Sequence, residues 1–172
     1  MDSGENQPLG TIATEQSDDT LTPAKLRVKA MDLLARREYS CSELAKKLTT
    51  KLLLADEDQA ILSTVLETLV KDDLLSDERF AESLVRSRVR KGHGPRRITQ
   101  ELHQCGIGAK LTALVLQDCG ADWHHQAAAV ADKKYGSQPA NDIKETAKRS
   151  RFLQYRGFNA EQIAFALTSQ RR

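Results

Sequence analysis

Apolar residues recur every three or four positions along most of the chain, which is the spacing of one face of an α-helix. The clearest run lies between residues 61 and 70, where six apolar side chains keep this spacing. Alternation at every second position, which indicates a half-buried β-strand, is not sustained in any stretch that favours a strand. Helix-start signals precede the periodic runs at residues 22–23, 40–43, 56–59, 94–95 and 159–162. The pattern predicts an all-α protein.

These helices repeat along the chain in groups of three. A constant offset of 54 residues relates Ser40, Cys41, Leu44, Leu48 and Leu53 to Gly94, Pro95, Ile98, Leu102 and Ile107. An offset of 51 residues then relates Leu102, Gly106 and Ile107 to Leu153, Gly157 and Phe158. Each group ends in a third helix, which we expect near residues 57–71, 109–118 and 160–169.

The repeat predicts three tandem three-helix modules, at residues 22–73, 74–120 and 121–172, after a disordered acidic tail at residues 1–21. A single module of about 50 residues would bury too little apolar surface to be stable alone. We therefore expect neighbouring modules to pack end to end into an elongated, curved body.

The segment from residue 75 to residue 107 is strongly basic. Its first helix places Arg79, Arg86 and Arg90 in a stripe that is separate from the apolar arc. From residue 86 to residue 104 the chain holds six Lys or Arg against one Glu. We interpret these arginines as lacking acidic partners and as facing phosphates or carboxylates. The common alternative is a solvated basic face, although such faces usually alternate in sign.

A second basic element lies in the third module. Lys144, Lys148, Arg151 and Tyr155 share one helical stripe, where the aromatic ring is placed to stack on a base or to pack under an arginine. The alternative is a tyrosine that bridges core and solvent. Trp123 is expected in the core or between modules. The candidate binding residues of both elements are Arg79, Arg86, Arg88, Arg90, Lys91, His93, Arg96, Arg97, Lys144, Lys148, Arg149, Arg151, Tyr155 and Arg156.

The charge of the chain is unevenly distributed. Residues 1–23 hold five acids and no Lys or Arg, which leaves 19 acids against 26 basic residues and a net charge of +7 in the rest. A basic body predicts a polyanionic partner, which the acidic tail would weakly mimic. Three irregularly spaced cysteines predict reduced thiols in a cytoplasmic protein. We found neither a signal peptide nor an apolar run long enough for a membrane helix, so no membrane association is expected.

Catalytic motifs are lacking. The chain has neither a GxxxxGK[ST] phosphate loop nor a GxGxxG fingerprint, and its acidic clusters stand at helix starts, where capping explains them. The spacing of His103, Cys105, Cys119, His124 and His125 fits no zinc motif. We therefore expect no enzyme activity, no metal and no cofactor. His93 is expected either to touch phosphate or only to shape the turn around it.

One long run of residues carries a family resemblance. The sequence DERFAESLVRSRVRKGHGPRRITQELHQCGI, from Asp77 to Ile107, resembles the central motif of the RecX family, bacterial regulators of the recombinase RecA. The resemblance extends from about Ala24 to the C-terminus and is weakest in the first module. Two positions just before the run depart from the family pattern. Asp73 stands where glycine is common, and Ser76 stands where aspartate is common.

The resemblance implies a fold of tandem three-helix modules and a function. A protein of this family is expected to be a monomer that binds the RecA filament on single-stranded DNA and limits its extension or promotes its disassembly. It would thereby inhibit the recombinase, ATPase and co-protease activities of RecA, which serve recombinational repair and the SOS response. Weak, non-specific binding of single-stranded DNA is expected, with duplex DNA as a further ligand.

Two other functions remain open at this point. Three-helix modules with a glycine turn also occur in helix-turn-helix transcription factors, although here the arginines follow two successive helices instead of one recognition helix. A purely protein-binding scaffold is the other alternative, and it would show no salt-dependent affinity for DNA.

Overall fold

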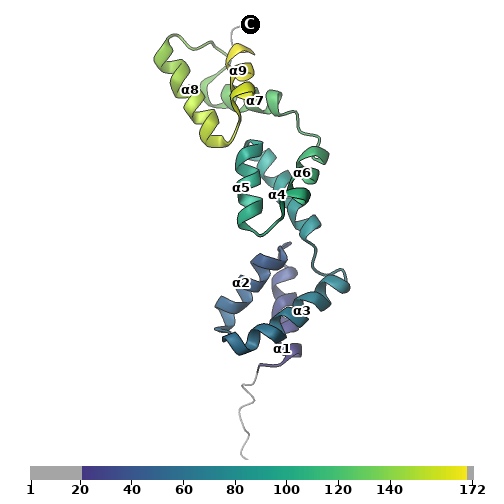
Figure 1. Cartoon of the computed structure of the whole chain (residues 1–172). Helices are drawn as coiled ribbons and strands as arrows, with labels where there is room; N and C mark the ends of the chain where they lie inside the picture. Colours follow the sequence, from purple (N-terminus) through teal and green to yellow (C-terminus); the bar gives the residue numbers. More distant parts are fainter. Residues whose placement is uncertain (1–20, 170–172) are drawn as a thin grey trace, which may run out of the picture.

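A computed structural model describes residues 21–169, which form nine α-helices and no strand. The helices of the first module are α1 (Pro23–Leu34), α2 (Cys41–Leu52) and α3 (Gln59–Lys71), with a short 3₁₀ turn η1 (Asp56–Asp58) before α3. The second group is α4 (Asp77–Arg90), α5 (Pro95–Gln104) and α6 (Ala109–Asp118). The third is α7 (Trp123–Tyr135), α8 (Ile143–Arg156) and α9 (Ala160–Ser169). Figure 1 shows the three groups following one another along an elongated body that bends between them, as the sequence predicted.

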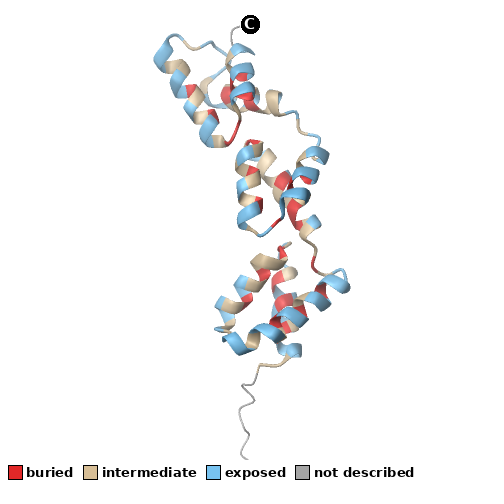
Figure 2. Cartoon of the chain, viewed as in Figure 1, coloured by how far each residue is buried: buried red, intermediate tan, exposed pale blue. Residues whose placement is uncertain are grey.

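Each group of three helices encloses its own apolar core (Figure 2). The largest fully buried side chains include Leu26, Leu44 and Leu69 in the first core, Ile98 and Leu102 in the second, and Leu153 and Phe158 in the third. Because each apolar core lies inside one module, neighbouring modules contact each other through their ends.

Two residues near the joints between modules refine the predicted boundaries. Leu75 is 1% exposed and belongs to the first core, so we propose that the first boundary follows Leu75 and not Asp73. Trp123 packs against both the second and the third core, as expected of an inter-module residue. The predicted acidic tail lies outside the described residues, except for Leu21, which packs against the first core.

Two of the predicted helix starts show how far local sequence decides structure. Asn159 and Gln162 form the expected reciprocal capping box, with N–H to side-chain oxygen distances of 2.9 and 2.8 Å. Ser40 caps α2 by accepting a hydrogen bond from the Glu43 N–H at 3.0 Å. The Glu43 carboxylate does not complete that box as predicted, because it accepts two hydrogen bonds from Arg37.

The repeat holds at the beginning of the middle helices but shifts by one residue at their ends. The predicted equivalence of Leu53 and Ile107 is wrong, because Leu53 is 88% exposed and Ile107 is 2% exposed. The helix α2 continues to Leu52, and Leu53 adopts the left-handed conformation (φ 52°) that Gly106 adopts after α5. Leu54 then takes the place of Ile107, since each donates its N–H to the carbonyl five residues earlier.

The three middle helices stack end to end. The Ser40 hydroxyl at the start of α2 donates to the Cys105 carbonyl at the end of α5, at 2.6 Å. The Gly94 and Arg96 N–H groups at the start of α5 donate to the Arg156 and Gly157 carbonyls at the end of α8, at 2.8 and 3.0 Å. Each joint pairs the positive end of one helix dipole with the negative end of the next. The helices α8, α5 and α2 therefore follow one another end to end in a bent column, with their dipoles head to tail (Figure 1).

The joint between α5 and α8 requires glycine. A Cβ on Gly94 would lie 2.5 Å from the carbonyl carbon of Gly157, and a Cβ on Gly157 would lie 2.5 Å from the Cβ of Arg97. These two positions are equivalent to Ser40 and Gly106 at the other joint, so the residues that define the sequence repeat are those that join the modules. None of the described helices is long and apolar enough to cross a membrane.

Candidate functional site

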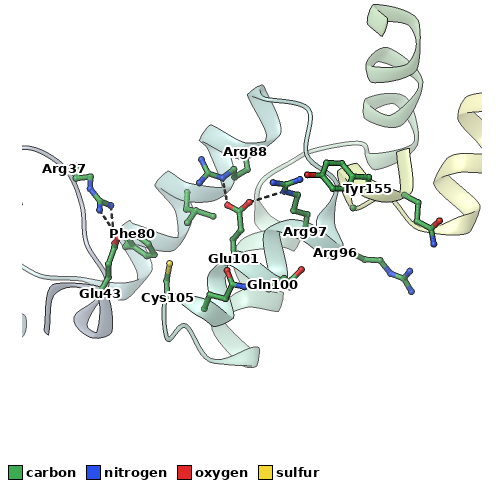
Figure 3. Close-up of a pocket in the computed structure, with 14 residues that line it drawn as sticks. Arg37, Glu43, Phe80, Arg88, Arg96, Arg97, Gln100, Glu101, Cys105 and Tyr155 are labelled. Carbon is green, nitrogen blue, oxygen red and sulfur yellow. Dashed lines mark hydrogen bonds and ion pairs between the residues drawn. The ribbon is translucent and has the colours of Figure 1, made fainter. Parts of the chain in front are cut away.

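A large depression runs beside the middle-helix column and takes residues from all three modules. We call it the arginine groove; it encloses about 870 Å³. Its lining residues are Arg37, Glu43, Phe80, Leu84, Arg88, Arg96, Arg97, Gln100, Glu101, Gln104, Cys105, Gln154, Tyr155 and Gly157. Figure 3 shows the charged and amide side chains projecting from α5 between Arg37 at one end and Tyr155 at the other.

Glu101 organises the middle of the arginine groove. Its carboxylate accepts hydrogen bonds from Nε of Arg88 and from Nε of Arg97, the latter at 3.3 Å (Figure 3). Burial by itself would raise the pKa of Glu101, but the hydrogen bonds and charges of the two arginines lower the pKa below its ordinary value. Glu101 is therefore an anion at neutral pH and holds two guanidinium groups in fixed orientations.

His93 lies beside this cluster, with Nδ1 3.7 Å from Glu101 and without a hydrogen-bond partner. Burial, followed by the charge of Arg97, lowers the pKa of His93, so the ring is neutral at physiological pH. Its backbone N–H donates to the Arg88 carbonyl at 3.0 Å, which closes the turn after α4. Of the two roles expected for His93, shaping the turn is the one with direct contacts here.

An ordered cation–aromatic contact lies at each end of the arginine groove. The guanidinium carbon of Arg37 lies 3.8 Å from the ring centroid of Tyr39, while two hydrogen bonds tie Arg37 to Glu43. At the other end the guanidinium carbon of Arg97 lies 5.4 Å from the ring centroid of Tyr155. Tyr155 is 75% exposed, so it does not bridge core and solvent. Its contact with Arg97 corresponds to the predicted packing under an arginine.

The expectation that the arginines of α4 lack acidic partners is wrong for Arg79, Arg86 and Arg88. Arg79 binds Glu38 at 3.3 Å and Asp73 at 2.6 Å, and thereby ties the start of α4 to the first module. Arg86 pairs with Glu82 one helical turn earlier, at 3.2 Å. The partners of Arg79 are distant in sequence or lie in the preceding turn, so counting charges along one helix face did not reveal them. Arg79 and Arg86 lie outside the arginine groove.

Arg149 also differs from the other candidates, because it is 3% exposed. Its guanidinium binds the Glu145 carboxylate and the Gln138 carbonyl, and it lies 5.2 Å from the ring centroid of Tyr135. These contacts anchor the loop between α7 and α8. The sequence held a signal for this placement, since Arg149 stands four residues before the buried Leu153 and so on the core face of α8.

The remaining candidates fall into three groups. Arg88, Arg96, Arg97 and Tyr155 line the arginine groove. Lys144, Lys148 and Arg151 are exposed on α8, in the helical stripe that ends at Tyr155. Arg90, Lys91 and Arg156 line a separate cleft between the second and third modules. The sequence did not reveal that Arg37 and Glu43 join the arginine groove, because this depends on how the first two modules meet.

Among residues 21–169, no group of three or more His, Cys, Asp and Glu side chains is placed to hold a metal ion. The arginine groove offers guanidinium, amide and phenol groups and the carboxylates of Glu43 and Glu101. Such a surface suits recognition of a charged macromolecule.

Comparisons with known proteins agree with this architecture. Residues 76–116 match the family model described as the second three-helix domain of RecX, and residues 124–167 match its third three-helix domain. The crystal structure of RecX from Lactobacillus salivarius is similar with a TM-score of 0.72, over 90% of this chain and 98% of that one, at 21% identity. At that identity the likeness establishes the fold.

The sequence relatives carry the comparison further. "Regulatory protein RecX" of Halorhodospira halophila is 43% identical over 141 residues, covering 82% of this chain and 85% of the relative. "Regulatory protein RecX" of Pseudomonas fluorescens strain Pf-5 is 38% identical over 152 residues, covering 88% of this chain and 94% of the relative. Identity at this level over most of both chains confirms the resemblance seen in the central motif: the chain belongs to the RecX family.

Proposed function

We propose that this protein is a negative regulator of RecA that binds the RecA filament on single-stranded DNA and limits its extension or promotes its disassembly. It acts as a cytoplasmic monomer, without catalysis or a cofactor. By occupying the filament it inhibits the recombinase, ATPase and co-protease activities of RecA, and so damps recombinational repair and the SOS response. Family membership supports a regulatory role, and the remainder is our inference.

The observation that carries this proposal is the arginine groove, which draws its lining from all three modules. A filament presents the same surface again at each protomer, so an elongated body with a continuous groove is suited to span neighbouring protomers. Several weak contacts along such a body add up to a strong one when their spacing matches the repeat. The groove is lined by four Arg, one Tyr and no Lys, and many Arg with few Lys are typical of a protein interface.

The transcription-factor alternative is less well supported. In a helix-turn-helix domain the helix after the turn enters the major groove of DNA and carries the base-reading side chains. The corresponding helices here are α3, α6 and α9. They hold one Lys, one Lys and no basic residue respectively, and no Arg. Such helices are poorly equipped to contact phosphates and guanines.

The test is RecA ATPase activity on single-stranded DNA, with this protein titrated at substoichiometric amounts. We expect wild-type protein to suppress hydrolysis. A variant with Arg96→Ala and Tyr155→Ala, both exposed groove residues, should need at least tenfold more protein for the same effect. Its thermal stability should stay close to that of wild type, because exposed side chains contribute little to folding.

The matched control is Lys29→Ala, which removes one exposed positive charge from α1, outside the arginine groove. It should inhibit RecA as well as wild-type protein does. If wild-type protein leaves ATP hydrolysis unchanged, the proposed function is wrong. If the groove variant is as potent as the control, inhibition does not depend on the arginine groove.

A further inference from the structure

A second depression, which we call the basic cleft, lies between the end of α4 and the helices α7 and α8. It encloses about 640 Å³ and shares no lining residue with the arginine groove. Five of its lining residues are cations: Arg90, Lys91, Lys133, Lys134 and Arg156. None of the described residues that line it is acidic. Lys133 and Lys134 are not among the residues that the sequence predicted for binding, because only the packing of the modules brings α7 next to the end of α4.

The five cations of the basic cleft have no acidic partner in the part of the chain that the structure describes. In the arginine groove, by contrast, Arg37, Arg88 and Arg97 are all paired with Glu43 or Glu101. Five like charges around one hollow repel one another, and that repulsion is relieved when a polyanion enters.

Two of the cations are held in place before any ligand arrives. The guanidinium of Arg156 donates to the Lys91 carbonyl at 3.0 Å and lies 5.4 Å from the ring centroid of Phe152. The ammonium of Lys134 lies 3.9 Å from the same centroid. Because a cation already covers its ring, Phe152 orients positive charge and does not offer a face for base stacking. The cleft is therefore equipped to bind a backbone without reading bases.

The residue types distinguish between two kinds of polyanion. Lysine is depleted at protein–protein interfaces, whereas lysine and arginine together neutralise the phosphates of nucleic acids. Three of the five cations are lysines on exposed positions, and each ammonium is a point charge that meets phosphate oxygens in several geometries.

We infer that the basic cleft binds the phosphodiester backbone of DNA. This deepens the proposed function, on which it rests only for the identity of the strand as the single-stranded DNA of the filament. The protein then has two separate contact surfaces: the arginine groove meets protein, and the basic cleft meets the DNA that the protein filament surrounds. Binding at the cleft is independent of sequence and weakens with salt.

The experiment measures binding of a fluorescent oligo-dT to the full-length protein by anisotropy, over a series of salt concentrations and without RecA. The test variant combines Lys133→Ala with Lys134→Ala. If both lysines meet phosphates, the slope of log K against log salt should become shallower by about 1.4, since each contact on a single strand contributes about 0.7. At 0.1 M salt this corresponds to a loss of affinity of roughly 25-fold.

The matched control combines Lys46→Ala with Lys47→Ala, another adjacent pair of exposed lysines, on α2. It removes the same charge and should leave the slope unchanged. A third variant, Arg90→Ala with Lys133→Ala, keeps the contact of Lys134 with Phe152 and should lose affinity like the test variant. A mixed-sequence single strand and a duplex of equal length complete the set, and both should be weakened by the same variants.

The inference fails if the test variant and the control keep the same slope and affinity for oligo-dT. It also fails if a poly-glutamate peptide of equal charge binds the cleft more tightly than oligo-dT, which would indicate an acidic protein partner. The proposed function is judged separately by RecA ATPase activity. A wild-type protein that binds oligo-dT through the cleft but never inhibits RecA would refute the regulatory function and leave the DNA site in place.

Discussion

Single residues decide how the arginine groove keeps its shape, and Glu101 does so most directly. It lies in the middle of α5, its side chain is 21% exposed, and it holds both Arg88 and Arg97. Removing its charge would leave two guanidinium groups close together without a counter-charge. The carboxylate thus contributes to stability and, by aiming Arg97 at Tyr155, to the surface offered to a partner.

We expect Glu101→Gln to lower the free energy of unfolding by about 1–3 kcal/mol at neutral pH, because two charge-assisted hydrogen bonds are weakened. The pKa of Glu101 is lowered in the folded protein, so its contribution is present above the ordinary value of 4.5 and is lost as the pH falls through the folded value. Urea denaturation at several pH values should show the wild type and the variant converging below pH 4.5.

The control for this prediction is Glu82→Gln. Glu82 pairs with Arg86 on the exposed surface of α4, where its side chain is 48% exposed. Such a pair contributes little, so the expected change is within about 0.5 kcal/mol at any pH. An equal loss in both variants would mean that Glu101 acts only as one surface charge among many.

Core residues test a different aspect of the same helix. Leu102 is fully buried in the second core, and Leu102→Ala should lower the free energy of unfolding by roughly 2–5 kcal/mol because it leaves a cavity. Leu114 on α6 is 48% exposed, and Leu114→Ala should have a much smaller effect. Thermal denaturation followed by circular dichroism separates the two. A small effect of Leu102→Ala would mean that the second core closes around the gap.

At the scale of elements, the decisive feature is the joint where α5 begins against the end of α8. Gly94 and Gly108 are both N-caps with extended backbones, at φ −84° and −68°. A Cβ on Gly94 would lie 2.5 Å from the backbone of Gly157, whereas a Cβ on Gly108 would meet nothing within 4 Å. We expect Gly94→Ala to separate the second and third modules and Gly108→Ala to leave them joined.

The two alanine variants form a matched pair, since both change an N-cap glycine to the same residue. For Gly94→Ala, amide hydrogen exchange should be faster at residue 94 and at Arg96, whose N–H groups donate to the Arg156 and Gly157 carbonyls, and Gly108→Ala should change little. Unchanged exchange at this joint in Gly94→Ala would show that the joint accommodates the added methyl group and does not require glycine.

The helices and their starts were largely predictable, because caps, glycines and apolar spacing act within a few residues of one another. Asn159 with Gln162, and Gly94 with Pro95, show this. The end of α2 was not predictable, because the left-handed position that ends it is occupied by Leu53 and not by a glycine, the usual sequence signal for a helix end. Asp73 is similar: at φ 56° it occupies a left-handed position that glycine adopts more readily, and it forms an ion pair with Arg79.

The candidate site was predictable in its location but not in its pairing. The basic central segment does line the arginine groove. Arg86 and Arg97 pair with a carboxylate on their own helix, but other partners come from another module or a facing helix: Glu38 for Arg79, and Glu101 for Arg88. For the same reason, the sequence did not predict that Lys133 and Lys134 line the basic cleft. Periodicity identifies a face of one helix, whereas pairing depends on which faces meet, and only the packed modules determine that.

At the scale of the whole molecule, the extent of the binding surfaces over three modules matters more for partner binding than any single patch. The column of α8, α5 and α2 holds the modules in line, so the arginine groove continues from Arg37 in the first module to Tyr155 in the third. The basic cleft lies between the second and third modules. A protein shortened by its third module would lose one end of the groove and one wall of the cleft together.

We therefore predict that a chain ending at Asp118 keeps its first six helices but inhibits RecA at least 100-fold less well, because linked weak contacts strengthen one another by about 10²–10⁴. The first two cores hold their own buried residues, so folding should survive the loss of Trp123 at the edge of the second core. Circular dichroism checks the helices before the ATPase titration. Full potency of the shortened chain would mean that the filament is recognised without the third module, and an inhibitor spanning several RecA protomers would have to be abandoned.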